Sequence, residues 1–204
     1  MQYEPKLIPF ATPLIGISDK TVAIHHDKLY VGYVNKMKEI ADKLVELSKN
    51  PEALAAANQS YSELRALRDG ETFATNGVYL HEHYFNVLGG DGAPSGSLAD
   101  AIAEQYGSVD ALIALVSATG MAMRGWVVLA WDTHLARLKI YGADAHNQGG
   151  VWGAIPLIVL DVYEHAYFID YGADRKAYIS DFWKNLNWSA ATAVYDKAKL
   201  INLS

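Results

Sequence analysis

Two residues, Asp161 and His165, have the types and the spacing to bind one metal ion together. They follow an apolar run, 155–160, that has the length and composition of a buried strand, and a segment of helical composition follows them. At the end of a rigid element, a carboxylate and an imidazole four residues apart could converge on one ion. The alternative is that Asp161 only caps the following helix. Spacing alone leaves both interpretations open.

Composition restricts the ligands that such a site could use. The chain has seven histidines and no cysteine, which excludes disulfides, thiolate zinc sites, iron–sulfur clusters and cysteine nucleophiles. Any metal must therefore be held by nitrogen and oxygen. Taken singly, each histidine is as easily a core or surface residue as a ligand, because a neutral imidazole serves in all three roles.

Length and charge define the general class of protein. A chain of 204 residues with 51% hydrophobic content is long enough to bury a substantial core. The net charge of -6 and the lack of any run of five lysines and arginines argue against nucleic acid or an anionic membrane as the main partner. No window approaches the eighteen apolar residues of a membrane span, and no basic stretch precedes an apolar core at the start. We expect a soluble, cytoplasmic protein with a small-molecule or protein partner.

The first half of the chain is predicted to be helical. Cap-forming residues at 18–21 precede a helix that is expected to run to about Asn50. A second helix, 52–68, is expected to pack antiparallel against the first. A break at Asp69-Gly70 is expected to separate it from a third helix, 72–88.

The second half changes its periodicity. Two helices are expected at 97–106 and 108–123, and two or three more between His165 and about Ile201. The strands expected between them are 125–131, 135–141 and 155–160. We therefore predict an α+β fold in which a helical hairpin domain, 1–90, precedes a C-terminal α+β domain, 91–204. That domain has a small three-stranded antiparallel sheet with surrounding helices, and the metal site lies at the domain interface.

Residues 161–167 (DVYEHAY) resemble the D-x-W-E-H-A-Y signature of the iron/manganese superoxide dismutases, with Tyr163 in place of the usual tryptophan. Residues 24–34 (IHHDKLYVGYV) resemble the family's I-H-H-x-K-H-H-x-x-Y-V segment. Residues 182–188 (FWKNLNW) resemble its F-W-x-x-x-N-W segment. The matching segments together run from about residue 8 to the carboxyl terminus. The resemblance implies conversion of superoxide to dioxygen and hydrogen peroxide by a mononuclear iron or manganese ion.

The resemblance implies a set of four metal ligands: His25, His81, Asp161 and His165. The family's N-H-x-x-F-W-x-x-L pattern fits residues 80–88 with His81 in the ligand position, whereas His83 fits less well. On a helix these two histidines lie about 200° apart, so both cannot face one ion. Such a nitrogen and oxygen set suits iron or manganese, one ion per subunit, with room for an exchangeable solvent ligand. The ligand set is compatible with either metal, and the resemblance slightly favours iron, or the use of both metals (cambialistic use).

The resemblance also implies residues around the metal. Tyr33 matches the tyrosine at the mouth of the substrate funnel, and Trp126 matches a tryptophan that walls the metal pocket. The group that hydrogen-bonds the metal-bound solvent is expected to be His146, since Gly77 stands where some members place a glutamine. Gln148 is the alternative donor. Considered without the family, Tyr33 would be an ordinary half-buried tyrosine, Trp126 a core residue and His146 a solvated loop residue.

Glu164 resembles the glutamate that reaches a metal-ligand histidine of the opposite subunit, so a homodimer is expected, with a tetramer as the alternative. The family's cross-subunit histidine and tyrosine are replaced by Leu29 and Phe168, which suggests an apolar contact in place of their hydrogen bond. Two rival functions are compatible with these residues. A mononuclear non-haem iron oxygenase would leave His25 unbound, and a non-catalytic metal-binding relative would load metal without turnover.

Overall fold

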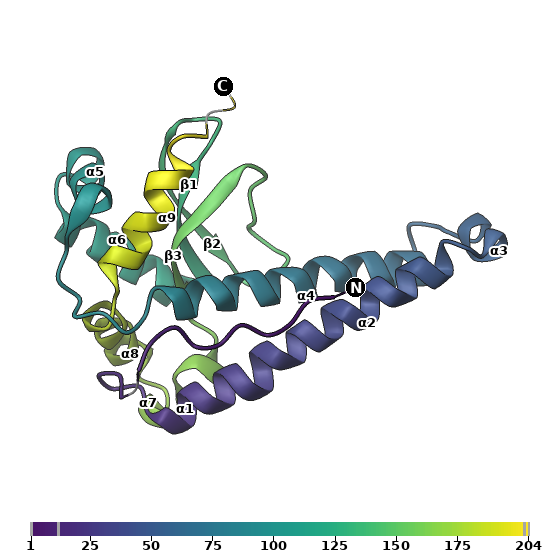
Figure 1. Cartoon of the computed structure of the whole chain (residues 1–204), viewed down its shortest axis with the longest axis horizontal. Coiled ribbons are helices and arrows are strands. Elements are labelled where there is room, and N and C mark those ends of the chain that lie inside the picture. Colours follow the sequence, from purple (N-terminus) through teal and green to yellow (C-terminus); the bar gives the residue numbers. More distant parts are fainter. Residues whose placement is uncertain (1, 12, 202, 204) are drawn as a thin grey trace.

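The computed structural model describes residues 2–11, 13–201 and 203. A long helical hairpin extends from a compact body in which helices surround a small sheet, as Figure 1 shows. The α+β class that the sequence predicts is confirmed. Among the described helices, none combines the length and the apolar character that crossing a membrane would require.

The first arm of the hairpin is one helical rod with an irregular turn inside it. Helix α1, Asp19–Ile24, continues into a π-helix, η1, over His25–Tyr30, and then into α2, Val31–Leu47. The side chain of Ser18 caps the start by accepting a hydrogen bond from the backbone N–H of Thr21. The rod ends three residues before the predicted end at Asn50.

The expected break at Asp69-Gly70 is wrong, because the chain leaves the helical path earlier. Helix α3, Pro51–Ala55, is short, and α4 runs without interruption over Glu63–Asn86. The predicted helices 52–68 and 72–88 therefore do not exist as separate elements.

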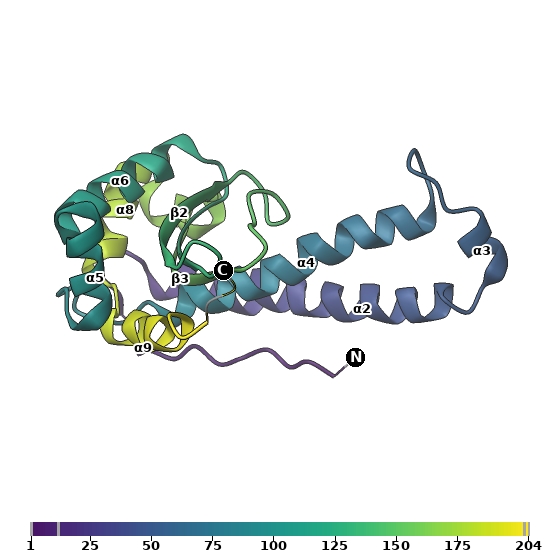
Figure 2. The same ribbon diagram turned by 90° about the horizontal axis from the view of Figure 1, so that it is seen from above.

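Local turn chemistry and a tertiary contact explain the difference. The side chain of Asn58 accepts hydrogen bonds from the backbone of Ser60 and Tyr61, and Ser62 caps α4, so the turn lies between 57 and 62. Gly70 stays helical where α4 packs on α2: a Cβ at this position would lie 3.2 Å from the Cδ1 of Ile40. The glycine thus serves close packing of the two helices (Figures 1 and 2).

The second half follows the prediction closely. Helices α5, Gly96–Tyr106, and α6, Val109–Ala122, are separated by Ser108, whose side chain caps α6. The strands are β1, Trp126–Asp132, β2, Arg137–Ala143, and β3, Ala154–Asp161. They form an antiparallel sheet in the order β2-β1-β3. A 3-10 turn and three helices follow: Glu164–Ala166, α7 (Phe168–Tyr171), α8 (Arg175–Lys184) and α9 (Trp188–Ala198).

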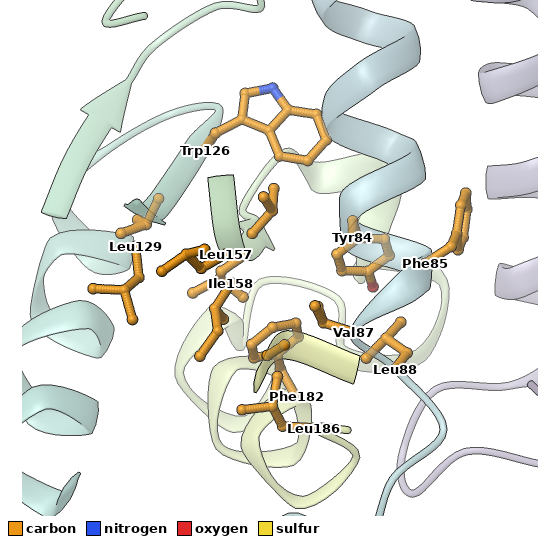
Figure 3. Packing of buried hydrophobic residues seen from close by; sticks show 14 of the residues in the cluster. Tyr84, Phe85, Val87, Leu88, Trp126, Leu129, Leu157, Ile158, Phe182 and Leu186 are labelled. Carbon is orange, nitrogen blue, oxygen red and sulfur yellow. The ribbon is translucent and has the colours of Figure 1, made fainter. Parts of the chain in front are cut away.

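One cluster of buried side chains joins the end of the hairpin to the sheet and to α8. Figure 3 shows Tyr84 of α4, Leu157 and Ile158 of β3 and Phe182 of α8 converging in this core. Each of these side chains is nearly inaccessible to solvent. Because the core includes both the last turns of α4 and the central strands, it holds that end of the helix against the sheet.

The segment after α4 pairs with the segment between α8 and α9 through backbone hydrogen bonds. The N–H of Gly90 donates to the carbonyl of Asn185 at 3.0 Å, and the N–H of Asn187 donates to the carbonyl of Val87 at 2.8 Å. A Cβ at Gly90 would lie 2.3 Å from the carbonyl oxygen of Leu186, which is closer than any real contact. A side chain cannot be added here unless two backbone segments move apart.

We therefore expect Gly90→Ala to lower the free energy of unfolding by about 2 to 3 kcal/mol, through overpacking against backbone atoms. Scanning calorimetry at matched metal content should show a Tm about 4 to 10 °C lower. The control is Gly32→Ala in α2, where a Cβ meets nothing within 4 Å. Because alanine favours helix over glycine, Gly32→Ala should raise stability by about 0.5 to 1 kcal/mol. Equal Tm values for Gly90→Ala and the unmodified chain would contradict the packing argument.

Candidate metal centre

Four side chains from three parts of the chain meet in one place. His25 lies at the start of η1, His81 on α4, Asp161 at the end of β3 and His165 in the 3-10 turn that follows. Their ligand atoms all lie within 4.8 Å of one another. His25, His81 and Asp161 are buried, and His165 is partly exposed. The structure thus brings together the four residues that the sequence analysis named as metal ligands.

Packing between aromatic rings fixes the position of His25. Its ring centroid lies 5.1 Å from those of Tyr84 and Phe85 on α4. It also lies 4.9 Å from the ring of His81. The rings of Tyr84 and Phe85 therefore pack His25 of η1 against helix α4, which carries His81.

A hydrogen bond sets the tautomer of His81. Its Nδ1 donates to the carbonyl of Gly77, one helical turn earlier, so Nε2 carries the free lone pair. Within the described part of the chain, neither His81 Nε2 nor His25 Nε2 has a hydrogen-bond partner, and both atoms are buried. Buried polar atoms without partners are rare, and those in a native structure require a reason.

All three imidazoles face one carboxylate oxygen. Asp161 Oδ2 lies 3.1 Å from His25 Nε2, 3.1 Å from His165 Nε2 and 3.8 Å from His81 Nε2. The 3.1 Å approach of His25 lacks the alignment of a hydrogen bond. Three nitrogen donors and a carboxylate oxygen that converge in this way fit a cation of the iron or manganese type. A bound cation would satisfy both partnerless nitrogens.

The electrostatics of the cluster favour a positive charge at its centre. Burial opposes ionisation of Asp161, yet attraction to His165 and the hydrogen bond from His165 hold the pKa of its carboxyl far below the ordinary value. Burial lowers the pKa of His25 and, more strongly, that of His81, so both rings are neutral near pH 7. For His165 the attraction of Asp161 outweighs burial and raises the pKa. The carboxylate thus favours positive charge at the position where the imidazoles converge.

His146 lies beside the cluster in a defined orientation. The indole N–H of Trp126 donates to His146 Nδ1 at 2.9 Å, so in the neutral ring the proton is on Nε2. Burial lowers the pKa of His146 to about 4, which keeps the ring neutral near pH 7. Gln148, the alternative donor, is exposed. Of these two candidates, only His146 is buried next to the cluster, with its ring centroid 5.8 Å from that of His81.

Tyr33 borders the same space. Its ring centroid lies 4.7 Å from that of His146 and 5.4 Å from that of His81. A Cβ at Gly77 would lie 2.9 Å from atoms of the Tyr33 ring, so the absent side chain of Gly77 makes room for the tyrosine. Burial, and secondarily the Asp161 carboxylate, raises the pKa of the Tyr33 hydroxyl, which therefore keeps its proton near neutral pH.

Tyr163 occupies the position of the family's tryptophan. Its ring stacks on His165 with centroids 5.1 Å apart and an interplanar angle of 16°. Its hydroxyl reaches the carbonyl of Asp144 at 3.5 Å. The neighbouring Glu164 is exposed on the surface of the chain, so the structure does not place it among the four clustered side chains.

A buried pair of tyrosines lies behind the Asp161 carboxylate and was not predicted from the sequence. The Tyr178 hydroxyl donates to the backbone carbonyl of Asp161 at 2.7 Å and lies 3.2 Å from the hydroxyl of Tyr84. Phe73 was also missed; its ring centroid is 4.6 Å from that of His146. No local pattern marks these residues, because their contacts join positions far apart in the sequence.

Comparison with known proteins agrees with the family resemblance of the sequence motifs. A family model described as "Iron/manganese superoxide dismutases, C-terminal domain" matches residues 94–194. The chain is 45% identical over 187 residues to "Superoxide dismutase [Fe]" of Aquifex pyrophilus, which covers 91% of this chain and 87% of the relative. It is 34% identical over 202 residues to "Superoxide dismutase [Mn] 1" of Halobacterium salinarum, which covers 97% and 96%. It is 35% identical over 188 residues to "Superoxide dismutase [Fe]" of Cupriavidus metallidurans, which covers 91% of both chains.

The geometry predicts different effects for two histidines of α4. Substitution His81→Ala removes a buried nitrogen of the cluster, so metal affinity should fall by more than about 100-fold. This loss exceeds the effect of replacing a residue that only supports a metal ligand through a hydrogen bond. Substitution His83→Ala should leave metal binding unchanged, because this side chain lines a separate cavity with Lys6 and Glu82. Elemental analysis after dialysis against a chelator measures the bound metal. Loss of metal in His83→Ala with retention in His81→Ala would show that the predicted helix register is wrong.

Proposed function

The chain belongs to the iron/manganese superoxide dismutase family, and from that membership we propose that His25, His81, Asp161 and His165 hold one iron or manganese ion per subunit. At this site superoxide is converted to dioxygen and hydrogen peroxide. The observation that carries the proposal is the pair of buried, partnerless nitrogens, His25 Nε2 and His81 Nε2, aimed at the Asp161 carboxylate. A cation at this point gives both nitrogens a partner.

When bound, iron or manganese supplies one-electron redox chemistry, which accepts an electron from one superoxide and gives an electron to the next. The chain's own contribution is to orient the ligands and to supply protons. Two superoxide ions and two protons give one dioxygen and one hydrogen peroxide, so each cycle consumes protons at the site. Side chains that border the cluster and can hydrogen-bond the solvent that delivers these protons are therefore required.

His146 and Tyr33 meet that requirement. Trp126 directs its N–H to His146 Nδ1, which leaves the proton of the neutral ring on Nε2. Tyr33, with its raised pKa, keeps its hydroxyl proton and packs against His146. We assign His146 to hydrogen bonding at the metal site, Tyr33 to the mouth of the substrate path, and Trp126 to the wall that fixes His146.

Glu164 is assigned to a contact with a second copy of the chain. It is exposed, and the nearby Phe168 and Ile169 are 55% and 45% exposed, which supports an apolar surface next to the carboxylate. In a homodimer Glu164 would orient a ligand histidine of the opposite subunit. Leu29 would join Phe168 in the apolar contact, with a tetramer as the alternative assembly. An antioxidant role in the cytoplasm completes the proposal.

No observation favours the oxygenase alternative, in which His25 stays unbound. His25 Nε2 lies as close to Asp161 Oδ2 as His165 Nε2 does, at 3.1 Å. This buried, partnerless nitrogen therefore faces the point at which the other imidazoles converge.

The decisive experiment measures superoxide dismutation by the purified chain loaded separately with iron and with manganese, with bound metal quantified in each sample. Activity in one or both forms that scales with bound metal is the expected result. Full metal loading without dismutation would contradict the proposed activity and would favour a non-catalytic relative.

His146→Gln should change the ratio of iron-supported to manganese-supported activity by about 10-fold, because a hydrogen-bond donor beside the metal tunes its reduction potential. The measurement compares the activities of both metal forms per bound metal. The matched control is His134→Gln, since His134 is an exposed histidine in the turn between β1 and β2. Unchanged ratios in both variants would remove His146 from its assigned role.

A further inference from the structure

The N-terminal arm, residues 2–11, runs along the helical hairpin instead of leaving the molecule (Figures 1 and 2). It contacts η1 and α4 at residues that directly follow two of the assigned ligands. His26 follows His25 on η1, and Glu82 follows His81 on α4. Nothing in the proposed function uses these contacts.

The carboxylate of Glu82 collects three partners. The hydroxyl of Tyr3 donates to Glu82 Oε1 at 2.7 Å, and that of Tyr30 donates to the same oxygen at 2.9 Å. The ammonium of Lys6 forms an ion pair with Glu82 Oε2. Since the Glu82 side chain is only 11% exposed, these partners replace most of its hydration.

The backbone of Lys6 is held on both sides by η1. Its N–H donates to the hydroxyl of Tyr30 at 2.8 Å, and its carbonyl accepts a hydrogen bond from His26 Nε2 at 2.8 Å. One arm residue is thus bound to η1 through its backbone and to α4 through its side chain. We call Tyr3, Lys6, His26, Tyr30 and Glu82 the arm clamp.

Polar contacts hold the arm at Lys6, because the neighbouring Leu7 is 89% exposed and a cavity of about 210 Å³ lies beside it, lined in part by Lys6, His26 and Glu82. Elsewhere in the arm, Tyr3, Ile8 and Phe10 are partly buried against the core. Weakening the polar contacts should therefore loosen the arm around Lys6 without opening a hole in the central core. This property separates the clamp from ordinary core packing.

We propose that the arm clamp holds η1 against α4, and thereby sets how fast a metal ion leaves the site between His25 and His81. The inference rests on the proposed function. His25 and His81 are 1% and 0% exposed, whereas the His165 side chain is 23% exposed, so the two buried histidines lose the ion when the elements that carry them separate or one ring swings out. The clamp ties these elements together one residue away from each ligand. Glu82 and Tyr30 are positioning residues, because they act on the ligands through the helices.

The test measures the rate of metal release from the full-length, metal-loaded chain into excess EDTA. Glu82→Ala removes the acceptor of three partners and should release metal about 10-fold faster, the size of effect that supporting residues of metal sites show. Glu82→Gln keeps an oxygen for the two tyrosines and should give an intermediate rate. The matched control is Glu39→Ala, since Glu39 is exposed on α2 and pairs only with Lys36 and Lys43 in the contacts described.

A second control separates positioning from general stability. Gly90→Ala should lower the Tm through backbone atoms of Leu186 and Asn187, which take part in none of the clamp contacts named above, so it shows how release depends on stability. Faster metal release from Glu82→Ala than from Gly90→Ala, compared at equal Tm, supports the clamp. A wild-type rate of metal release from Glu39→Ala supports it as well. A wild-type release rate in Glu82→Ala, or release rates that follow Tm alone, would overturn it. If the unmodified chain bound neither metal, the proposed function would fail together with the clamp.

Discussion

The burial of one carboxylate, Asp161, constrains everything around it. A buried carboxylate is costly unless it has cationic or hydrogen-bonding partners. Three imidazoles converge on Asp161, from η1, α4 and the turn after β3, and the last of these, His165, forms a hydrogen bond with it. Two of them are more than 70 residues away in sequence, so the hairpin must dock on the end of the central sheet for the group to form at all. The core that Figure 3 shows, from Tyr84 to Phe182, provides that docking. The fold and the candidate metal centre therefore depend on the same contact between α4 and β3.

The helices meet this constraint through local departures from regular geometry. The first rod opens into a π-helix over His25–Tyr30, the segment that carries the first of the four clustered residues, and such turns commonly occur at functional sites. On α4, Gly77 contributes twice: its carbonyl fixes the tautomer of His81, and its missing side chain leaves space for the ring of Tyr33. One small residue thus links the orientation of His81 to the position of Tyr33, which borders the cluster. A larger residue at this position would displace Tyr33.

The sequence predicts what local chemistry determines and fails where distant contacts decide. The three strands, the cap at Ser108 and the start of the first helix were predictable, because periodicity and capping residues are local signals. The break at Asp69-Gly70 was wrong because Gly70 serves packing against Ile40, which no local pattern reveals. The same holds for Tyr178 behind Asp161 and for Tyr3 on Glu82, whose hydrogen bonds span 17 and 79 positions. The four clustered residues were found because motif resemblance carries information about distant pairs that composition does not.

Tyr163 departs from the family signature but keeps an aromatic ring at this position. Its ring stacks on His165 and lies edge-on to Trp126, so the aromatic wall that a tryptophan would form is kept. The phenol adds a hydroxyl, which burial keeps protonated by raising its pKa to about 12, and this hydroxyl reaches the carbonyl of Asp144. Asp144 lies two residues before His146, whose Nδ1 is already bound by Trp126. Tyr163 thus stacks on His165 and makes a polar contact to the segment that carries His146 beside the cluster.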